Sequence, residues 1–228
     1  MMQGGYVASL AAGDRMGPIR VQIRRPLSPG DELRLDEVDD RWDVYRADDL
    51  VLRGQPSPMH VDDPGPPDNE AIAAAMQRPL PFPLPFASCS GCGERDDALG
   101  FKIRPLSTSG QMVAEWTPQR RDAASDGNTP RAHVWTVIDC ITSWCVFSDP
   151  PPSGSGQAVT GNIAMDFRSE LSAGEPYYFQ SWRVDDDDRR IVCGGSVHDA
   201  DGQLVALADQ ELFRTDGWGM EIPEAPLV

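Results

Sequence analysis

Residues 133–147 form a segment that is apolar almost throughout and contains a single acidic side chain, Asp139. The segment is long enough for about four helical turns and is apolar on nearly every face, which predicts a buried helix. A carboxylate on a buried helix is costly unless it is neutralised, hydrogen-bonded or used in chemistry. Asp139 is therefore the first candidate for a functional residue. The alternative is a structural carboxylate that bonds to the backbone, to Thr142 or to Ser143.

Runs with the composition and alternation of β-strands lie on both sides of this segment. The segment Asp199-Ala200-Asp201-Gly202 has the composition of a hairpin turn. One helix followed by an antiparallel meander is an α+β layout. The predicted strands are residues 99–105 and 111–117 before the helix, and residues 158–168, 177–184, 191–198 and 204–214 after it.

Prolines are concentrated between residues 56 and 86, a composition typical of a linker. Within this region, residues 68–76 have the pattern of a short helix with Asp68 as its N-cap. The chain is therefore predicted to comprise a first unit at residues 1–56, a linker at 57–86 and a second unit at 87–228.

The two predicted units share a local pattern. Residues 23–32 align with residues 167–176, and the alternative is a chance similarity over ten residues. The same order of elements precedes both segments, which favours an internal duplication. These elements are a helix and a strand at residues 4–12 and 19–23, and again at residues 131–147 and 163–167.

The formal net charge of −16 disfavours nucleic acids and anionic membranes as partners. The sequence contains no apolar run of about 18 residues or more, so no membrane-spanning helix is predicted. The start of the chain does not show the basic and then apolar pattern of a signal peptide. We therefore expect a cytoplasmic protein with no nucleic-acid or membrane partner.

The five cysteines form an odd set, which fits a reducing compartment better than a disulfide framework. Cys89 and Cys92 have the spacing of a zinc-binding pair, but the sequence offers no second Cys-x-x-Cys or histidine pair to complete such a site. We therefore interpret the two thiols as packing and turn residues. Neither a metal nor a cofactor is expected.

Four segments carry a resemblance to a known family. They are the Gly-Gly-Tyr-Val-Ala-Ser-Leu sequence that begins at Gly4, the buried helix with Asp139, the Val-Thr-Gly-Asn sequence with Thr160, and the Ala-Asp-Gln-Glu sequence with Gln210. Together they resemble the acyl-CoA thioesterase II family. The resemblance implies an α+β double-hotdog fold, with two repeats that each wrap a curled antiparallel sheet around a central helix. The first repeat lacks the strand that precedes its helix in the family, as it would if the start of the chain were truncated.

The resemblance also implies roles for these residues. Asp139, Thr160 and Gln210 would hold one water molecule for attack on a thioester, with Asp139 as the catalytic base. The backbone amides of Gly4 and Gly5 would bind the oxyanion. No metal and no covalent nucleophile takes part in the chemistry proposed for the family.

A geometric argument places these groups in one site. A helix rises about 1.5 Å per residue, so Asp139 lies more than roughly 10 Å from the start of its own helix. In paired hotdog units the two central helices run antiparallel, which would bring Asp139 to the first turn of the other helix at Gly4 and Gly5. The free amides and the dipole of that turn favour an oxyanion.

The expected substrate is an acyl-CoA or acyl-carrier thioester, and the expected assembly is a homodimer of double hotdogs. Two alternatives stay open. One is a hotdog hydratase or dehydratase, which would pair its carboxylate with a histidine. The other is a hotdog protein without activity that binds acyl-CoA or only builds an assembly.

Overall fold

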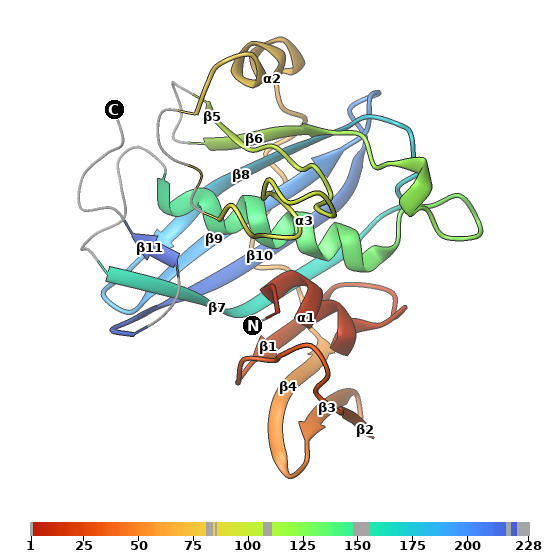
Figure 1. Cartoon of the computed structure of the whole chain (residues 1–228), viewed down its shortest axis with the longest axis vertical. Coiled ribbons are helices and arrows are strands. Elements are labelled where there is room, and N and C mark those ends of the chain that lie inside the picture. The colour runs from red at the N-terminus through yellow and green to blue at the C-terminus, as the bar shows by residue number, and fades with distance from the viewer. Residues whose placement is uncertain are drawn as a thin grey trace.

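The computed structural model describes residues 2–80, 84, 86–106, 111–147, 156–217 and 220–222. Within this part of the chain, three α-helices accompany one large antiparallel sheet (Figure 1). The helices are α1 (Gly4–Ala12), α2 (Asn69–Met76) and α3 (Arg131–Ser143). The strands are β1 (Ile19–Ile23), β2 (Arg34–Val38), β3 (Arg41–Arg46), β4 (Asp49–Pro56), β5 (Arg104–Leu106), β6 (Gln111–Trp116), β7 (Gly156–Phe167), β8 (Tyr177–Asp186), β9 (Arg190–His198), β10 (Leu204–Thr215) and β11 (Met220–Ile222).

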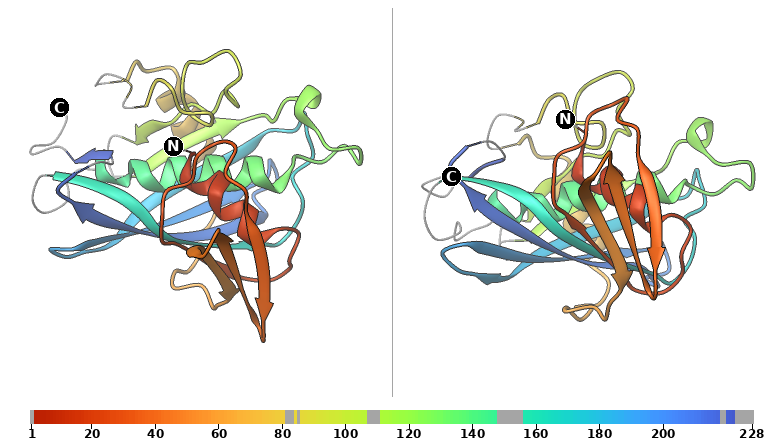
Figure 2. Two further views of the ribbon diagram at one scale, coloured as in Figure 1. Left: turned by 60° about the horizontal axis from the view of Figure 1, so that its bottom comes forward. Right: turned by 90° about the horizontal axis from the view of Figure 1, so that it is seen from below.

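The strand order is β2-β3-β4-β1-β7-β10-β9-β8-β6-β5, and β11 pairs with β7. The sheet has two parts, because α1 packs mainly on β1, β3 and β4 and also touches β7, whereas α3 packs on β6 to β10. The pairing of β1 with β7 joins these parts, with Ile19 opposite Met165 and Val21 opposite Ile163. Both views in Figure 2 show α3 lying along one face of the larger part, with α1 beside it.

Helix α3 confirms the prediction of a buried helix. All residues from Val134 to Thr142 are buried, and Trp135 and Ile138 are among the largest fully buried side chains. The helix continues into a 3₁₀ turn at Trp144–Phe147, whose first three residues are also buried. Asp139 is thus buried, between α1 and the sheet.

Helix α1 crosses α3 at close range because its contact face carries small residues. Gly5, Ala8, Ala11 and Ala12 are buried. A Cβ atom on Gly5 would lie 2.0 Å from the backbone oxygen of Trp135, so any side chain at this position would push the helices apart. This close crossing brings the first turn of α1 to the middle of α3.

The predicted linker contains the expected short helix. The Asp68 side chain accepts hydrogen bonds from the backbone N–H groups of Glu70 and Ala71, which confirms Asp68 as the N-cap of α2. The predicted hairpin turn lies between β9 and β10, with Gly202 at a φ of 76°. Residues 81–83 and 85 of the predicted linker lie outside the described part of the chain.

The strand predicted at residues 99–105 is wrong, because only its last two residues belong to β5. Phe101 and Ile103 are buried, so the apolar pattern of this segment did indicate core residues. However, the backbone N–H groups of Leu99 and Phe101 bond to the carbonyl groups of Ser90 and Gly91 instead of a neighbouring strand. The segment therefore packs as an irregular layer against the cysteine-containing loop.

Candidate functional site

Asp139 lies in a ring of hydrogen-bond donors, although only 5 % of the residue is exposed. Its Oδ1 atom accepts a hydrogen bond from the Thr160 hydroxyl at 3.0 Å and another from the Gln210 amide nitrogen at 2.5 Å. The same Gln210 nitrogen lies 2.8 Å from the Thr160 hydroxyl oxygen. The structure therefore brings together the three side chains that the sequence singled out, one each from α3, β7 and β10.

A β-bulge explains why two of these side chains meet. Gln210 lies opposite Ile163, but the register shifts after Glu211, so Leu212 lies opposite Thr160. In an unbroken ladder Leu212 would face Gly161, and Thr160 would point to the other side of the sheet. The extra residue turns Thr160 toward α3.

The first turn of α1 completes the surroundings of Asp139. A Cβ atom on Gly4 would lie 3.2 Å from both carboxylate oxygens and 3.3 Å from the Thr160 Cβ. The Gly5 backbone N–H hydrogen-bonds the carboxylate. Gly4 and Gly5 thus lie beside the Asp139 carboxylate, as an antiparallel arrangement of α1 and α3 requires.

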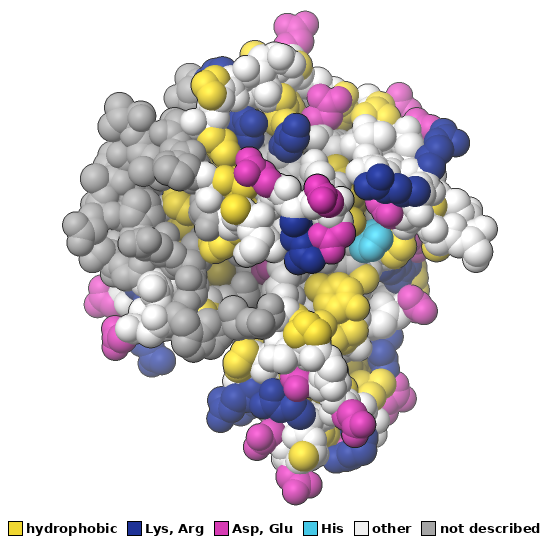
Figure 3. All heavy atoms as spheres, in the orientation of Figure 1, with side chains coloured by type: hydrophobic (Ala, Val, Ile, Leu, Met, Phe, Trp, Pro, Cys, Tyr) yellow, Lys and Arg dark blue, Asp and Glu magenta, His cyan; other side chains and the backbone are white. Residues whose placement is uncertain are grey.

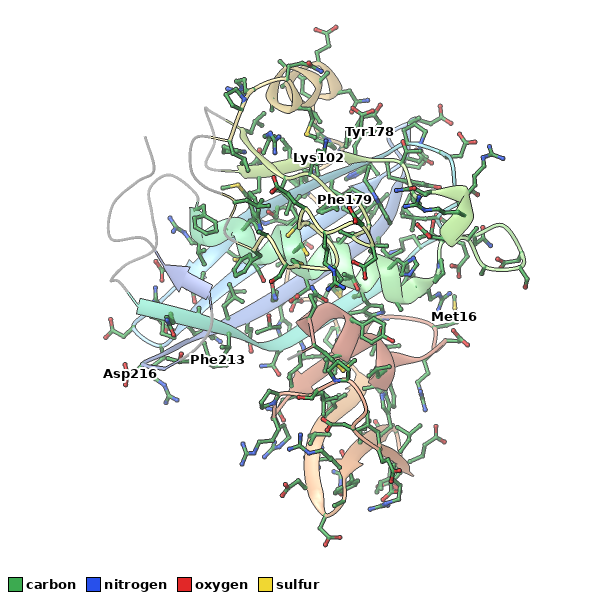
Figure 4. All side chains as sticks on the ribbon, in the orientation of Figure 1. Met16, Lys102, Tyr178, Phe179, Phe213 and Asp216 are labelled. Atoms are coloured by element: carbon green, nitrogen blue, oxygen red, sulfur yellow. The ribbon has the colours of Figure 1, made fainter. Side chains whose placement is uncertain are left out.

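The opposite end of the helix pair supports the same orientation. Arg131, the first residue of α3, donates to the backbone oxygen of Arg15 at 3.2 Å, just beyond the end of α1. It also reaches Met16, which is labelled in Figure 4. The start of α3 therefore adjoins the end of α1, so the two helices run antiparallel.

Gln3 is a member of this site that the sequence did not reveal. Its side-chain nitrogen donates to Asp139 Oδ2 and, at 3.0 Å, to the backbone oxygen of Thr136. Its side-chain oxygen accepts from the Tyr6 N–H at 2.8 Å, so Gln3 also caps α1. Glutamine is not among the preferred N-cap residues, and no sequence motif marks it.

Burial raises the pKa of Asp139 to about 6, because the charged form loses its solvent. The hydrogen bonds from Thr160, Gly5 and Gln210 oppose this shift by stabilising the carboxylate, while negative charge on Cys89 adds to it. A carboxylate with this pKa is ionised at neutral pH, yet it is basic enough to accept a proton.

Gln210 is fully buried and is fixed from a second side by Ser143. The Gln210 nitrogen lies 3.2 Å from the Ser143 hydroxyl, which in turn donates to the Gln210 oxygen at 3.4 Å. Ser143 is therefore a partner of Gln210. The purely structural alternative expected bonds from the backbone, Thr142 or Ser143. Among the described residues, the Asp139 carboxylate bonds to the backbone N–H of Gly5, but its side-chain partners are Thr160, Gln210 and Gln3.

Three thiols could hold a metal ion beside this site. The Sγ atoms of Cys89, Cys92 and Cys140 lie within 4.8 Å of one another. Hydrogen bonds from Cys140 and Cys92 lower the pKa of Cys89, whereas hydrogen bonding to Cys89 raises the pKa of Cys140. Sequence spacing paired Cys89 with Cys92 but gave no reason to add Cys140.

No helix in the described ranges combines the length and apolar character that crossing a membrane requires. No protein-family model matches the sequence, and a search of curated proteins found no match.

Several solved structures resemble the chain. The tesB protein of Mycobacterium avium subsp. paratuberculosis has a TM-score of 0.57 and 14% sequence identity, covering 93% of this chain and 87% of that one. A Streptococcus mutans protein bound to acetyl-CoA has a TM-score of 0.45 and 18% identity, covering 51% of this chain and 89% of that one. The PaaI protein of Escherichia coli, from the phenylacetic acid degradation operon, has a TM-score of 0.46 and 18% identity, covering 54% and 83%.

The likeness to the tesB structure extends over nearly the whole chain. At this level of identity the likeness establishes the fold. The chain therefore has an α+β hotdog fold.

Proposed function

We propose that this protein hydrolyses an acyl-CoA or acyl-carrier thioester with a water molecule activated by Asp139. The observation that carries the proposal is the convergence of Asp139, Thr160 and Gln210 beside the first turn of α1. The three side chains come from separate elements and share one hydrogen-bond network.

In the proposed reaction, Thr160 and Gln210 hold the water next to the Asp139 carboxylate. The water oxygen bonds to the thioester carbonyl carbon while Asp139 takes a proton from it. The tetrahedral intermediate then collapses, the carbon–sulfur bond breaks, and the proton passes from Asp139 to the departing thiolate. The products are a carboxylic acid and a free thiol.

The first turn of α1 would stabilise the oxyanion of the intermediate. The first N–H groups of a helix have no partners within it, and the helix dipole favours negative charge there. The Gly5 N–H already contacts Asp139, so it holds the base as well. This leaves the Gly4 N–H as the main donor to the oxyanion, with Gly5 beside it.

The two parts of the sheet support an internal duplication. Helix α1 with β1–β4 repeats the order of α3 with β7–β10 in a shorter form, and the two helices meet antiparallel. We propose that the parts are unequal hotdog repeats, at residues 1–56 and 87–228, which form one composite site between them. Asp139 comes from the second repeat and the helix amides come from the first.

We propose further that the protein forms a homodimer of double hotdogs. Tyr6, Leu10 and Met16, on and just beyond α1, are large apolar side chains that are 40 %, 39 % and 73 % exposed. Figure 3 shows apolar side chains gathered where the smaller part of the sheet meets the larger one. Sedimentation of the purified chain would measure its mass, and a monomer at micromolar concentration would contradict this point.

The test of the activity is thiol release from a panel of acyl-CoA thioesters with short, long and aromatic acyl groups. Asp139→Asn removes the base, so we expect the rate to fall by about 10²–10⁴. Asp166→Asn is the matched control, because Asp166 is also 5 % exposed but pairs with Arg168 away from this network. Full hydrolysis by the Asp139→Asn variant would contradict the mechanism.

The same panel separates the alternatives. Binding of a non-hydrolysable acyl-CoA without turnover of the true thioester would indicate a binding protein. Hydration of an enoyl-CoA would indicate a hydratase, although the partners that the structure gives to Asp139 include no histidine among the described residues.

A further inference from the structure

Three cysteines meet beside α3 although they lie far apart in the sequence. Cys89 and Cys92 belong to a loop between α2 and β5, and Cys140 belongs to α3, 51 residues after Cys89. Cys92 and Cys140 are buried, and Cys89 is half-buried. The Cys89 and Cys140 Sγ atoms are 3.5 Å apart, and all three Sγ atoms lie within 4.8 Å of one another.

This spacing fits a tetrahedral zinc site. Zinc–sulfur bonds of about 2.3 Å place two thiolates of a tetrahedron about 3.8 Å apart. Thiolates are the side chains that select soft or borderline ions such as Zn²⁺. We propose that Cys89, Cys92 and Cys140 together bind one Zn²⁺ ion. Three protein ligands leave the fourth position to water or another small ligand.

The backbone of the loop is arranged around the sulfur of Cys89. The Gly91 N–H donates to Cys89 Sγ at 3.4 Å, and the Gly93 N–H donates to the Cys89 carbonyl oxygen at 3.0 Å. Hydrogen bonds to a ligating atom orient it and tune the metal site. The loop thus holds the Cys89 sulfur in place before any ion binds.

Glycines allow the loop to approach α3. A Cβ atom on Gly91 would lie 2.7 Å from Cys140 Sγ, and one on Gly93 would lie 2.4 Å from the Cys89 carbonyl oxygen. The loop is also tied to the irregular layer that follows it, through Leu99 and Phe101. The Cys-x-x-Cys-Gly sequence therefore forms a turn that brings the thiols of Cys89 and Cys92 next to the thiol of Cys140.

Zinc binding would fasten this loop to α3 one residue away from Asp139. Each thiol gives up its proton to solvent when its sulfur bonds to the ion, so binding releases protons and weakens in acid. Because the ion binds the folded chain, it also stabilises that state by mass action.

The test uses the full chain, purified under a reducing agent and then freed of excess metal. We expect about one zinc per chain by elemental analysis. We expect Co²⁺ in its place to give a thiolate-to-cobalt charge-transfer band in the near ultraviolet. Serine substitution of Cys89, Cys92 or Cys140 should weaken zinc binding by more than about tenfold, since even outer partners of a ligand contribute that much.

Cys145→Ser is the matched control. Cys145 is also buried, but its thiol bonds to the Ser181 hydroxyl at 3.3 Å and lies outside the cluster. This variant should keep the zinc stoichiometry of the wild type. Asp139→Asn should keep it too, so a failure of the proposed hydrolysis would leave this inference standing.

Reduced wild-type protein that binds no zinc and gives no cobalt band would overturn the proposal. The purified protein could instead contain a disulfide bond within the cluster. If it bound no zinc after that bond was reduced, the proposal would also be overturned, and the cysteines would be a disulfide pair. If the serine variants fail to fold, the cobalt spectrum of the wild type decides: the band supports the site and its absence refutes it.

Discussion

Thr160 and Gln210 face the same side of the sheet because one extra residue, Gly161, interrupts the ladder between β7 and β10. Glycine suits this position, since a Cβ atom there would lie 2.2 Å from the ring of Phe213, which is labelled in Figure 4. The hydroxyl and the amide are then 2.8 Å apart and share Asp139 as their acceptor. The site depends on this bulge as much as on the three side chains themselves.

The role of the Thr160 hydroxyl can be tested separately from the shape of the side chain. Thr160→Val keeps the branched side chain but removes the hydrogen bond to the carboxylate, whereas Thr160→Ser keeps the hydroxyl. A hydrogen bond to a charged group is worth about 1.5–3 kcal/mol, which corresponds to a roughly tenfold to hundredfold loss of kcat/KM for the valine variant. The serine variant should retain most of the activity. Equal activity in the two variants, measured by thiol release, would rule out a role for the hydroxyl.

The buried helix and Asp139 were predicted from local patterns, whereas Thr160, Gln210, Gly4 and Gly5 were predicted from the resemblance to a known family. The Asp139 carboxylate stood alone among apolar residues, and the strands showed alternation. The bulge at Gly161 left no such signal, since a shift of register depends on pairing between strands that are distant in sequence.

Gln3 and Cys140 escaped prediction for a related reason. Gln3 reaches Asp139, 136 positions away, and Cys140 reaches Cys89, 51 positions away, so a short motif does not reveal either contact. The strand expected at residues 99–105 failed because burial and strand pairing are separate properties. Phe101 is buried, but its backbone donor is taken by Gly91.

Gly4 and Gly5 should respond differently to alanine. At Gly5 the new Cβ atom meets the backbone of Trp135, which cannot move without shifting α3, so overpacking should cost about 1–3 kcal/mol or more in the free energy of unfolding. At Gly4 the nearest atoms are the Asp139 carboxylate oxygens at 3.2 Å, which belong to a side chain.

We therefore expect Gly4→Ala to change stability less than Gly5→Ala does, yet to lower kcat, because the methyl group enters the space proposed for the oxyanion. Denaturant unfolding measures the first effect and steady-state hydrolysis the second. A Gly4→Ala variant with wild-type kcat would show that the thioester does not approach this turn.

Gln3 should stabilise α1 as its N-cap. Gln3→Ala removes the bond to the Tyr6 N–H and the bonds to α3, so we expect a loss of about 1 kcal/mol, within the range measured for helix caps. Gln119→Ala is the matched control, because Gln119 also precedes a helical turn but makes no side-chain cap bond. Urea unfolding of both variants measures the difference. Equal free energies of unfolding for the Gln3→Ala and Gln119→Ala variants would argue against a stabilising role of Gln3 as the N-cap.

A buried ion pair should hold the two parts of the sheet together. Arg20 on β1 reaches Asp209 on β10 across β7, with a nitrogen–oxygen distance of 2.7 Å, and their side chains are only 12 % and 1 % exposed. The carboxylate also accepts from the His60 backbone N–H at 2.9 Å. Removal of one member of a buried pair leaves the other charge buried without a partner. Arg20→Met should therefore lower the free energy of unfolding by about 3–5 kcal/mol.

The double variant Arg20→Met with Asp209→Leu removes both charges and should recover much of that loss, since apolar replacements of buried pairs are often neutral. Surface pairs such as Arg95 and Asp97 offer the comparison, because exposed pairs contribute about 1 kcal/mol or less. Thermal and denaturant unfolding of the single, double and surface variants would measure these differences. If Arg20→Met unfolds like the Arg95→Met control, the pair does not couple the two parts of the sheet, and their union depends on the β1–β7 ladder and the helix crossing alone.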